Sequence, residues 1–231
     1  FYPLKYLAEK VGGEHVTVTS LTPDGAEPHD LELSPKMVDS LASADAVVYL
    51  AGFQGAVDEA IEQHAPKTVI DVSSAAQLVA IDSTSNHPGE DEGTDEAQSG
   101  EAQSGEAADH DHEHADGDHE HADHDHADHD HHHHDMSMDP HFWLDPARMA
   151  NAATLVGDKL AEADPTNAET YKANAKALNE ELTSLGDDLV AKTSTCQIKT
   201  FVTAHTAFGY LADRTGLTQV GISGLDPESS P

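Results

Sequence analysis

The first eighty residues carry the hydrophobic patterns of alternating strands and helices. Residues 16–19 alternate valine with threonine, which predicts a strand that ends at a Pro-Asp-Gly turn. Ser34 followed by Pro35 is a typical helix start. The apolar residues that follow it at helical spacing are Met37, Leu41 and Ala44. Residues 46–50 and 68–72 are continuous apolar runs, as expected of parallel strands covered on both faces. This region therefore predicts an alternating α/β lobe.

Two helices are predicted after residue 138. Asp145 and Pro146 start the first helix. Its apolar positions are Met149, Ala153, Val156 and Leu160. The second helix opens at Asp164 and runs to about Thr193, which would make it about 40 Å long at ~1.5 Å per residue. Its apolar residues recur at spacings of four and three and are Tyr171, Ala175, Leu178, Leu182, Leu185 and Leu189. Such a helix can join two lobes. A coiled coil is the alternative, which the small residue Ala175 and the short repeat disfavour.

The last part of the chain predicts a β-α-β unit. A strand over 199–203 is followed by a short helix that ends at Gly216, and a second strand covers 218–222. His205 then falls at the carboxyl end of its strand, where open α/β sheets place ligand sites.

These elements predict an α/β fold with three parts. Residues 1–163 form an N-terminal α/β lobe that includes a loop over 83–138, residues 164–194 form the linking helix, and residues 195–231 begin a C-terminal α/β lobe. The chain opens without a signal peptide and stops soon after a predicted strand. We therefore expect a processed protein that lacks part of its second lobe.

Charge and cysteine content narrow the function classes. Acidic residues outnumber basic residues 44 to 11, which disfavours nucleic acid and anionic membrane surfaces and attracts cations. No apolar run approaches the length of a membrane span. Cys196 is the single cysteine, so any metal must bind through nitrogen and oxygen. We expect Cys196 to be a small buried residue before a strand, or to pair with a cysteine beyond residue 231.

The loop over 83–138 is a low-complexity segment rich in Gly, Ser, Asp, Glu and His, which cannot order itself by burying apolar surface. Its clustered histidines are His110, His112, His114, His119, His121, His124, His126, His129, His131, His132, His133 and His134. Imidazole and carboxylate suit Zn²⁺, Ni²⁺, Cu²⁺ and Co²⁺, so the loop is expected to bind metal at many weak sites. The alternatives are a solvated acidic linker or an engineered tag, and the interspersed aspartates argue against a tag.

Three further histidines lie at junctions between predicted elements: His29, His141 and His205. A single histidine in such a place is more often satisfied by ordinary hydrogen bonds. Together, however, three neutral imidazoles brought to one cleft by strand ends would make a zinc site with bonds of about 2.0 to 2.1 Å. His15 and His64 lack this context and are expected to be exposed.

Four motifs in this order resemble the zinc and manganese solute-binding proteins of ABC importers, the cluster A-I family, and most closely its zinc-specific ZnuA-like branch. They are Phe-Tyr-Pro-Leu at 1–4, Glu-Pro-His-Asp at 27–30, Asp-Pro-His-Phe-Trp-Leu-Asp-Pro at 139–146 and Thr-Ala-His-Thr-Ala-Phe-Gly-Tyr-Leu at 203–211. The resemblance covers nearly the whole chain outside the histidine-rich loop.

The resemblance implies two α/β lobes joined by one rigid helix, with metal in the cleft between them. It implies His29 and His141 as ligands from the first lobe and His205 from the second. Manganese-binding relatives typically carry a carboxylate at the position of His205, so a histidine there favours zinc. A fourth ligand could be Glu27, water, or a carboxylate beyond the chain. Some zinc relatives have a glutamate directly before the first histidine, where this chain has Pro28.

The resemblance also implies a role outside the cytoplasm, in the periplasm or lipid-anchored on the outer face of the cell membrane. There a monomer would capture Zn²⁺ and deliver it to a membrane permease. The loop would raise the local zinc concentration beside the tighter site. A surface adhesin or a zinc-storage protein is the main alternative. A zinc hydrolase is disfavoured, because the sequence has no HExxH motif and no motif that positions a general base.

Overall fold

The computed structural model describes residues 1–64, 66–81 and 138–225. Its elements in chain order are α1 (Tyr2–Gly12), η1 (Gly13–His15), α2 (Pro35–Ser43), β1 (Val47–Tyr49), α3 (Gly55–His64), β2 (Val69–Asp71), α4 (Ser73–Ala76), η3 (Phe142–Leu144), α5 (Pro146–Ala163), η4 (Pro165–Asn167), α6 (Ala168–Ser194), β3 (Thr200–Thr203), α7 (Gly209–Thr215) and β4 (Thr218–Gly221). Except for Met138, the predicted loop, with His87 and its twelve clustered histidines, lies outside the described residues.

The N-terminal part has the predicted α/β character. β1 and β2 pair in parallel with Val47 opposite Val69, as the two apolar runs indicated. α2 begins at Pro35 with Ser34 as its N-cap residue, which confirms the predicted helix start.

Helix α1 was not predicted. Its buried positions Leu4, Leu7 and Val11 follow helical spacing and belong to the main hydrophobic cluster, together with residues of α5 and α6. The amphipathic signal is therefore present in the sequence, but the segment is short and starts at the first residue.

The strand predicted over 16–19 is absent from the described elements, and this prediction was wrong. Val16 is extended, yet the segment pairs with no neighbour. Residues 16–21 and β1 both line one groove, which also has residues of α1, α5 and α6 in its wall. Alternation of valine and threonine by itself does not provide a strand with a pairing partner.

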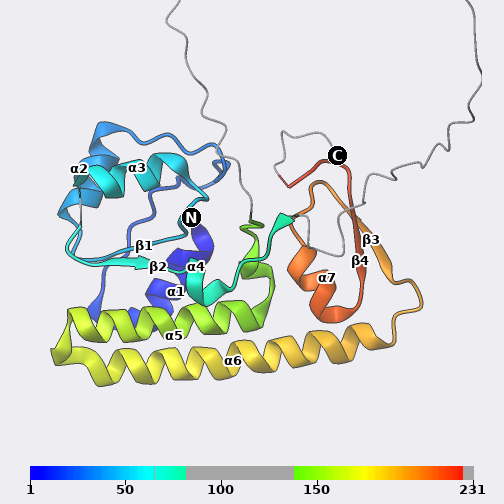
Figure 1. The fold of residues 1–231 in the computed structure, drawn as a ribbon. Helices are drawn as coiled ribbons and strands as arrows, with labels where there is room; N and C mark the ends of the chain where they lie inside the picture. Colours follow the sequence, from blue (N-terminus) through cyan, green and yellow to red (C-terminus); the bar gives the residue numbers. More distant parts are fainter. Residues whose placement is uncertain (65, 82–137, 226–231) are drawn as a thin grey trace, which may run out of the picture. The chain divides into compact units, whose positions relative to one another are not determined.

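Helices α5 and α6 make the largest packed surface of the described residues and run side by side (Figure 1). Gly157 permits this approach, since an added Cβ there would lie 2.5 Å from the Cβ of Ala175. α6 is nine residues longer than α5, with 27 against 18, and its far end contacts α7.

The apolar face of α6 is only partly buried. Leu178 and Leu182 are buried, but Leu185 is 48% exposed. At the next position Gly186 turns toward Arg214 of α7, whose guanidinium lies 3.2 Å from the place of an added Cβ. The apolar face of α6 packs against α5 up to the start of α5, and beyond that point α6 contacts α7 instead.

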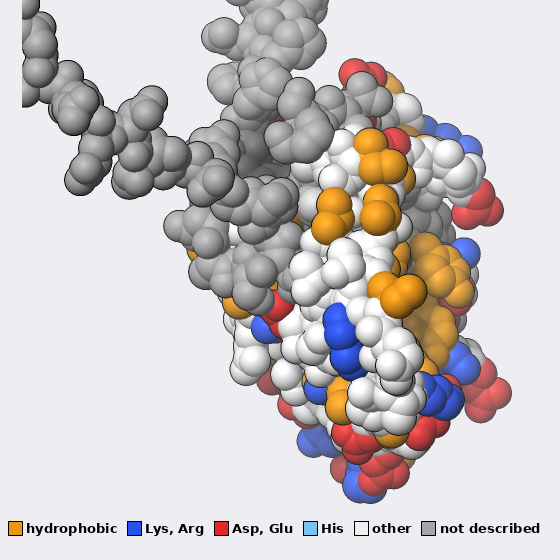
Figure 2. Space-filling model, turned by 90° about the vertical axis from the view of Figure 1, so that its right-hand side faces the viewer, with side chains coloured by type: hydrophobic (Ala, Val, Ile, Leu, Met, Phe, Trp, Pro, Cys, Tyr) orange, Lys and Arg blue, Asp and Glu red, His pale blue; other side chains and the backbone are white. Residues whose placement is uncertain are grey.

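The C-terminal part confirms the predicted β-α-β unit. β3 and β4 pair in parallel with Thr200 opposite Thr218, and α7 connects them and ends at Gly216 with φ 66°. Hydrophobic side chains gather on the face shown in Figure 2. The exposed large hydrophobic residues in and around β3 and β4 are Ile198, Val202, Val220 and Ile222.

Cys196 is exposed, so the expected burial was wrong. It follows the end of α6 in a connection that runs over the surface before β3. No helix among the described residues is long and apolar enough to cross a membrane.

Candidate metal centre

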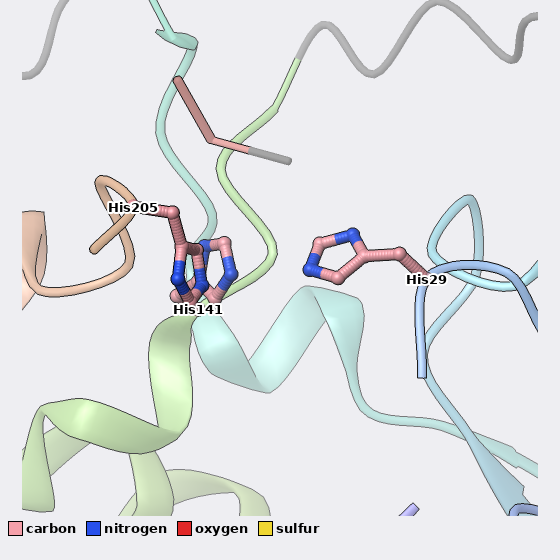
Figure 3. Close-up of side chains that lie close together, drawn as sticks. All are labelled: His29, His141 and His205. Carbon is pink, nitrogen blue, oxygen red and sulfur yellow. The ribbon is translucent and has the colours of Figure 1, made fainter. Parts of the chain in front are cut away.

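Three imidazole rings meet at one point of the fold (Figure 3). One nitrogen from each of His29, His141 and His205 can be chosen so that all three atoms lie within 4.8 Å of one another. The nitrogens of a tetrahedral zinc site are about 3.4 Å apart when each bond is about 2.05 Å. The three rings are therefore close enough together for one zinc ion to reach a nitrogen of each.

His141 is the most buried ring of the three, with 1% of the residue exposed. Its Nδ1 lies 2.8 Å from Oδ1 of Asp139, and its backbone N–H donates to the same oxygen at 2.9 Å. Nε2 is also buried and has no hydrogen-bond partner among the described residues. A proton on Nδ1 donates to the carboxylate, so the lone pair of Nε2 is available to a metal ion.

Asp139 is itself held from several directions and is 1% exposed. Its backbone N–H donates to the carbonyl of Val79 at 2.9 Å, and its carbonyl accepts from the hydroxyl of Tyr210 at 2.7 Å. The carboxylate that orients His141 is therefore anchored through its own main chain.

His29 lies in the loop between η1 and α2. The buried amide of Gln54 fixes the preceding residue, because its Nε2 donates to the carbonyl of Pro28 at 2.8 Å. The same Nε2 lies 3.1 Å from the hydroxyl of Thr22. The ring of Phe53 meets the imidazole edge-on with centroids 4.9 Å apart.

Glu27 is exposed and lies outside this three-histidine group. Its Oε1 accepts a hydrogen bond from the backbone N–H of His29 at 3.3 Å. In this structure the carboxylate therefore supports the loop that carries His29.

His205 lies two residues after the end of β3, close to the strand end where it was predicted. Its carbonyl accepts from the hydroxyl of Thr203 at 2.8 Å and from Nε2 of Gln219 at 3.0 Å. Gln219 is 2% exposed and also accepts the backbone N–H of Phe208 through Oε1 at 3.0 Å. One buried amide on β4 thus holds both sides of the His205 turn.

Sequence reasoning missed these supporting residues. Gln54 and Gln219 are single amides inside otherwise ordinary segments, and only their burial sets them apart. Asp139 carried a weak signal, since it precedes His141 by two residues in the quoted motif. His15, which ends η1, and His64, which ends α3, are both exposed as expected.

The fold and the site define a class: an α/β protein with a candidate centre for a metal ion bound by nitrogen ligands. The sequence comparison then identifies the family. The chain belongs to the ZnuA family, described as zinc-uptake complex component A, periplasmic, whose model matches residues 1–231.

Individual relatives agree with this assignment. The zinc-binding protein AdcA of Streptococcus pyogenes serotype M3 is 33% identical over 232 residues, which is 100% of this chain and 40% of that protein. The high-affinity zinc uptake system protein ZnuA of Bacillus subtilis is 30% identical, over 100% of this chain and 61% of that protein. The crystal structure of Zn(II)-bound AdcA from Streptococcus pneumoniae matches with a TM-score of 0.68 at 28% identity, covering 97% of this chain and 38% of that one. The chain thus spans less than two thirds of the length of these relatives.

Proposed function

We propose that this chain is the zinc-binding component of an ABC-type import system. It captures one Zn²⁺ ion with His29, His141 and His205 and delivers it to a membrane permease. The observation that carries this proposal is the convergence of the three rings, with the buried Nε2 of His141 directed by Asp139. The family is one of uptake components, which disfavours the hydrolase alternative.

Zinc is the cargo that fits the donor set best. Three neutral imidazoles suit Zn²⁺, whereas Mn²⁺ favours carboxylate and water. The names of the relatives, which are zinc-binding and zinc-uptake proteins, support the same metal.

The arrangement of the elements supports two lobes with the metal between them. β1 and β2 belong to an N-terminal lobe over 1–163, and β3 and β4 begin a C-terminal lobe over 195–231. The linking helix over 164–194 corresponds to η4 and α6, and α6 contacts α1, α5 and α7. His29 and His141 would then come from one lobe and His205 from the other.

Three nitrogen ligands leave one position of a tetrahedral zinc ion open. Water, Glu27 or a carboxylate from a longer form of the protein could fill it. Glu27 lies outside the group of side chains that could share one ion, which favours water or another carboxylate.

The family assignment and a lipoprotein relative support a role in the periplasm or on the outer face of the cell membrane, where we propose that the chain acts as a monomer. In this setting the histidine-rich loop would collect zinc and supply it to the tighter site. If deletion of the loop left zinc uptake unchanged under severe zinc limitation, a buffering or sensing role would replace collection.

The proposal is tested by zinc titration of a loop-deleted protein against a competing chelator. One tight equivalent is expected, and it should be lost in each of His29→Ala, His141→Ala and His205→Ala. His15→Ala is the matched control, because His15 is exposed and lies outside the group. Retention of the tight equivalent in any of the three variants would remove that residue from the site.

Metal-dependent binding to the cognate permease separates transport from storage and adhesion. A transport component should bind the permease with an affinity that changes between the zinc-bound and zinc-free protein. Equal binding in both states, or none, would favour the storage or adhesin alternative.

A further inference from the structure

We propose that Tyr210 is a positioning residue that presets the distance between two zinc ligands. It ties α7, the helix that follows His205, to the segment that carries His141. This inference rests on the proposed zinc site, because it concerns how that site is held before the ion arrives.

The hydroxyl of Tyr210 joins two segments that are far apart in the sequence. It donates to the carbonyl of Asp139 at 2.7 Å and accepts from the backbone N–H of Val79 at 3.0 Å. Asp139 in turn donates its own N–H to the carbonyl of Val79 at 2.9 Å. The buried side chain of Tyr210 therefore provides a hydrogen-bond partner for the main chain at Val79 and at Asp139.

The ring of Tyr210 is also held in place by its surroundings. The residue is 2% exposed, and the guanidinium carbon of Arg148 lies 4.3 Å from the ring centroid. Arg148 also donates to the carbonyls of Ala76 and Gln77. Burial raises the pKa of Tyr210 to about 12, so the hydroxyl remains a proton donor at any working pH.

A second contact from the same helix lies on the other side of His141. Nε of Arg214, one turn beyond Tyr210, lies 2.7 Å from Oδ1 of Asp145. Asp145 is the N-cap of α5 and accepts the N–H of Ala147. Helix α7 therefore contacts the His141 segment at Asp139 and at Asp145, two residues before the ligand and four residues after it.

These two contacts have a consequence for zinc affinity. His205 lies five residues before Tyr210, so the helix that begins just after one ligand is bonded to the segment of another. A site whose ligands are already spaced for the ion loses less conformational freedom on binding than one that must be ordered. Without the hydroxyl, the carbonyl of Asp139 and the N–H of Val79 lose a shared partner, and the two ligand segments can separate.

The test compares Tyr210→Phe with Tyr171→Phe in the full-length protein. Tyr171 is the matched control: it is also 2% exposed, and its hydroxyl donates to Asp164 at 2.8 Å, away from the three histidines. Zinc affinity is measured by chelator competition, and thermal unfolding of the zinc-free proteins is measured in parallel. We expect Tyr210→Phe to weaken zinc binding about tenfold, as for other residues that support a ligand. Tyr171→Phe should leave the zinc affinity unchanged. It should lower the unfolding temperature by about as much as Tyr210→Phe does.

Arg214→Gln provides a second variant, should Tyr210→Phe unfold. It removes the other contact and should weaken zinc binding in the same direction. Unchanged zinc affinity in the folded variants would overturn the inference, and so would an equal loss of affinity in Tyr171→Phe. A wild-type protein without a tight zinc equivalent would overturn the proposed function as well. Tight wild-type binding that is lost in His141→Ala but kept in Tyr210→Phe would leave the proposed function standing and reject only the role of Tyr210.

Discussion

Oδ1 of Asp139 lies 2.8 Å from Nδ1 of His141, and each residue is 1% exposed. This contact acts on the imidazole itself, since it sets which nitrogen carries the proton and which one faces the other two rings. His29 and His205 are supported differently. Gln54 and Gln219 bond to main-chain carbonyls at or beside these residues and so hold their loops. The candidate site thus combines one ring set by a carboxylate with two loops set by amides.

Replacing Asp139 with asparagine should lower zinc affinity by about 10- to 100-fold, the usual effect of losing the partner of a ligating histidine. The amide keeps the shape of the side chain but lacks the negative charge that makes His141 a stronger ligand. Affinity is measured by chelator competition. Asp164→Asn is the control, because Asp164 caps η4 away from the three rings. Equal affinities in the two variants would contradict this role for Asp139.

The two amides that hold the ligand loops should matter to different degrees. Gln219→Leu removes the acceptor of the Phe208 N–H and one donor to the His205 carbonyl, and should cost about 1 to 3 kcal/mol in the free energy of unfolding, besides weakening zinc binding. Gln54→Leu should weaken zinc binding with a smaller loss of stability, since fewer groups depend on it. Denaturant unfolding and zinc titration measure both quantities. The exposed Gln63 supplies the control Gln63→Leu, which should change neither.

Trp143 is the only tryptophan and should report zinc binding by fluorescence. Its ring centroid lies 5.1 Å from that of His141, and the side chain packs against the main hydrophobic cluster. Zinc added to the loop-deleted protein should change the emission with one equivalent, and His141→Ala should abolish the change. The same change in the His141→Ala protein would mean that Trp143 senses zinc bound elsewhere.

Asp164 should make stability depend on pH in the acid range. Hydrogen bonds from Asn167 and from Tyr171 lower the pKa of this carboxyl below its usual range. Because the folded state favours the charged form, the contribution is present above the unfolded pKa of about 3.9 and is lost as pH falls through the lowered folded value. The stability difference between the wild type and Asp164→Asn should therefore shrink below about pH 4. A difference that stayed constant down to pH 2 would contradict this assignment.

Local patterns were sufficient for most of the elements. The helix start at Asp145 and Pro146, the parallel runs around Val47 and Val69, and the β-α-β unit that ends at β4 all appear in the structure as predicted. These features depend on caps, turn residues and periodicity within a few positions of the chain. The strand at 16–19 failed because a strand needs a neighbour with which to pair. The exposure of Leu185 on α6 could not be predicted from the sequence, because burial depends on which helix packs against that part of α6.

The kind of chemistry available can be inferred from the amino-acid sequence alone. The single cysteine and the abundance of histidine and carboxylate limit the ligands to nitrogen and oxygen, and the motifs around His29, His141 and His205 mark these residues as candidates. How the three rings meet and which residues hold them depends on the packing of the folded chain. Tyr210 bonds to Asp139 across 71 residues and to Val79 across 131. No local pattern encodes such contacts, because they form only when helices and strands that are distant in the sequence pack together.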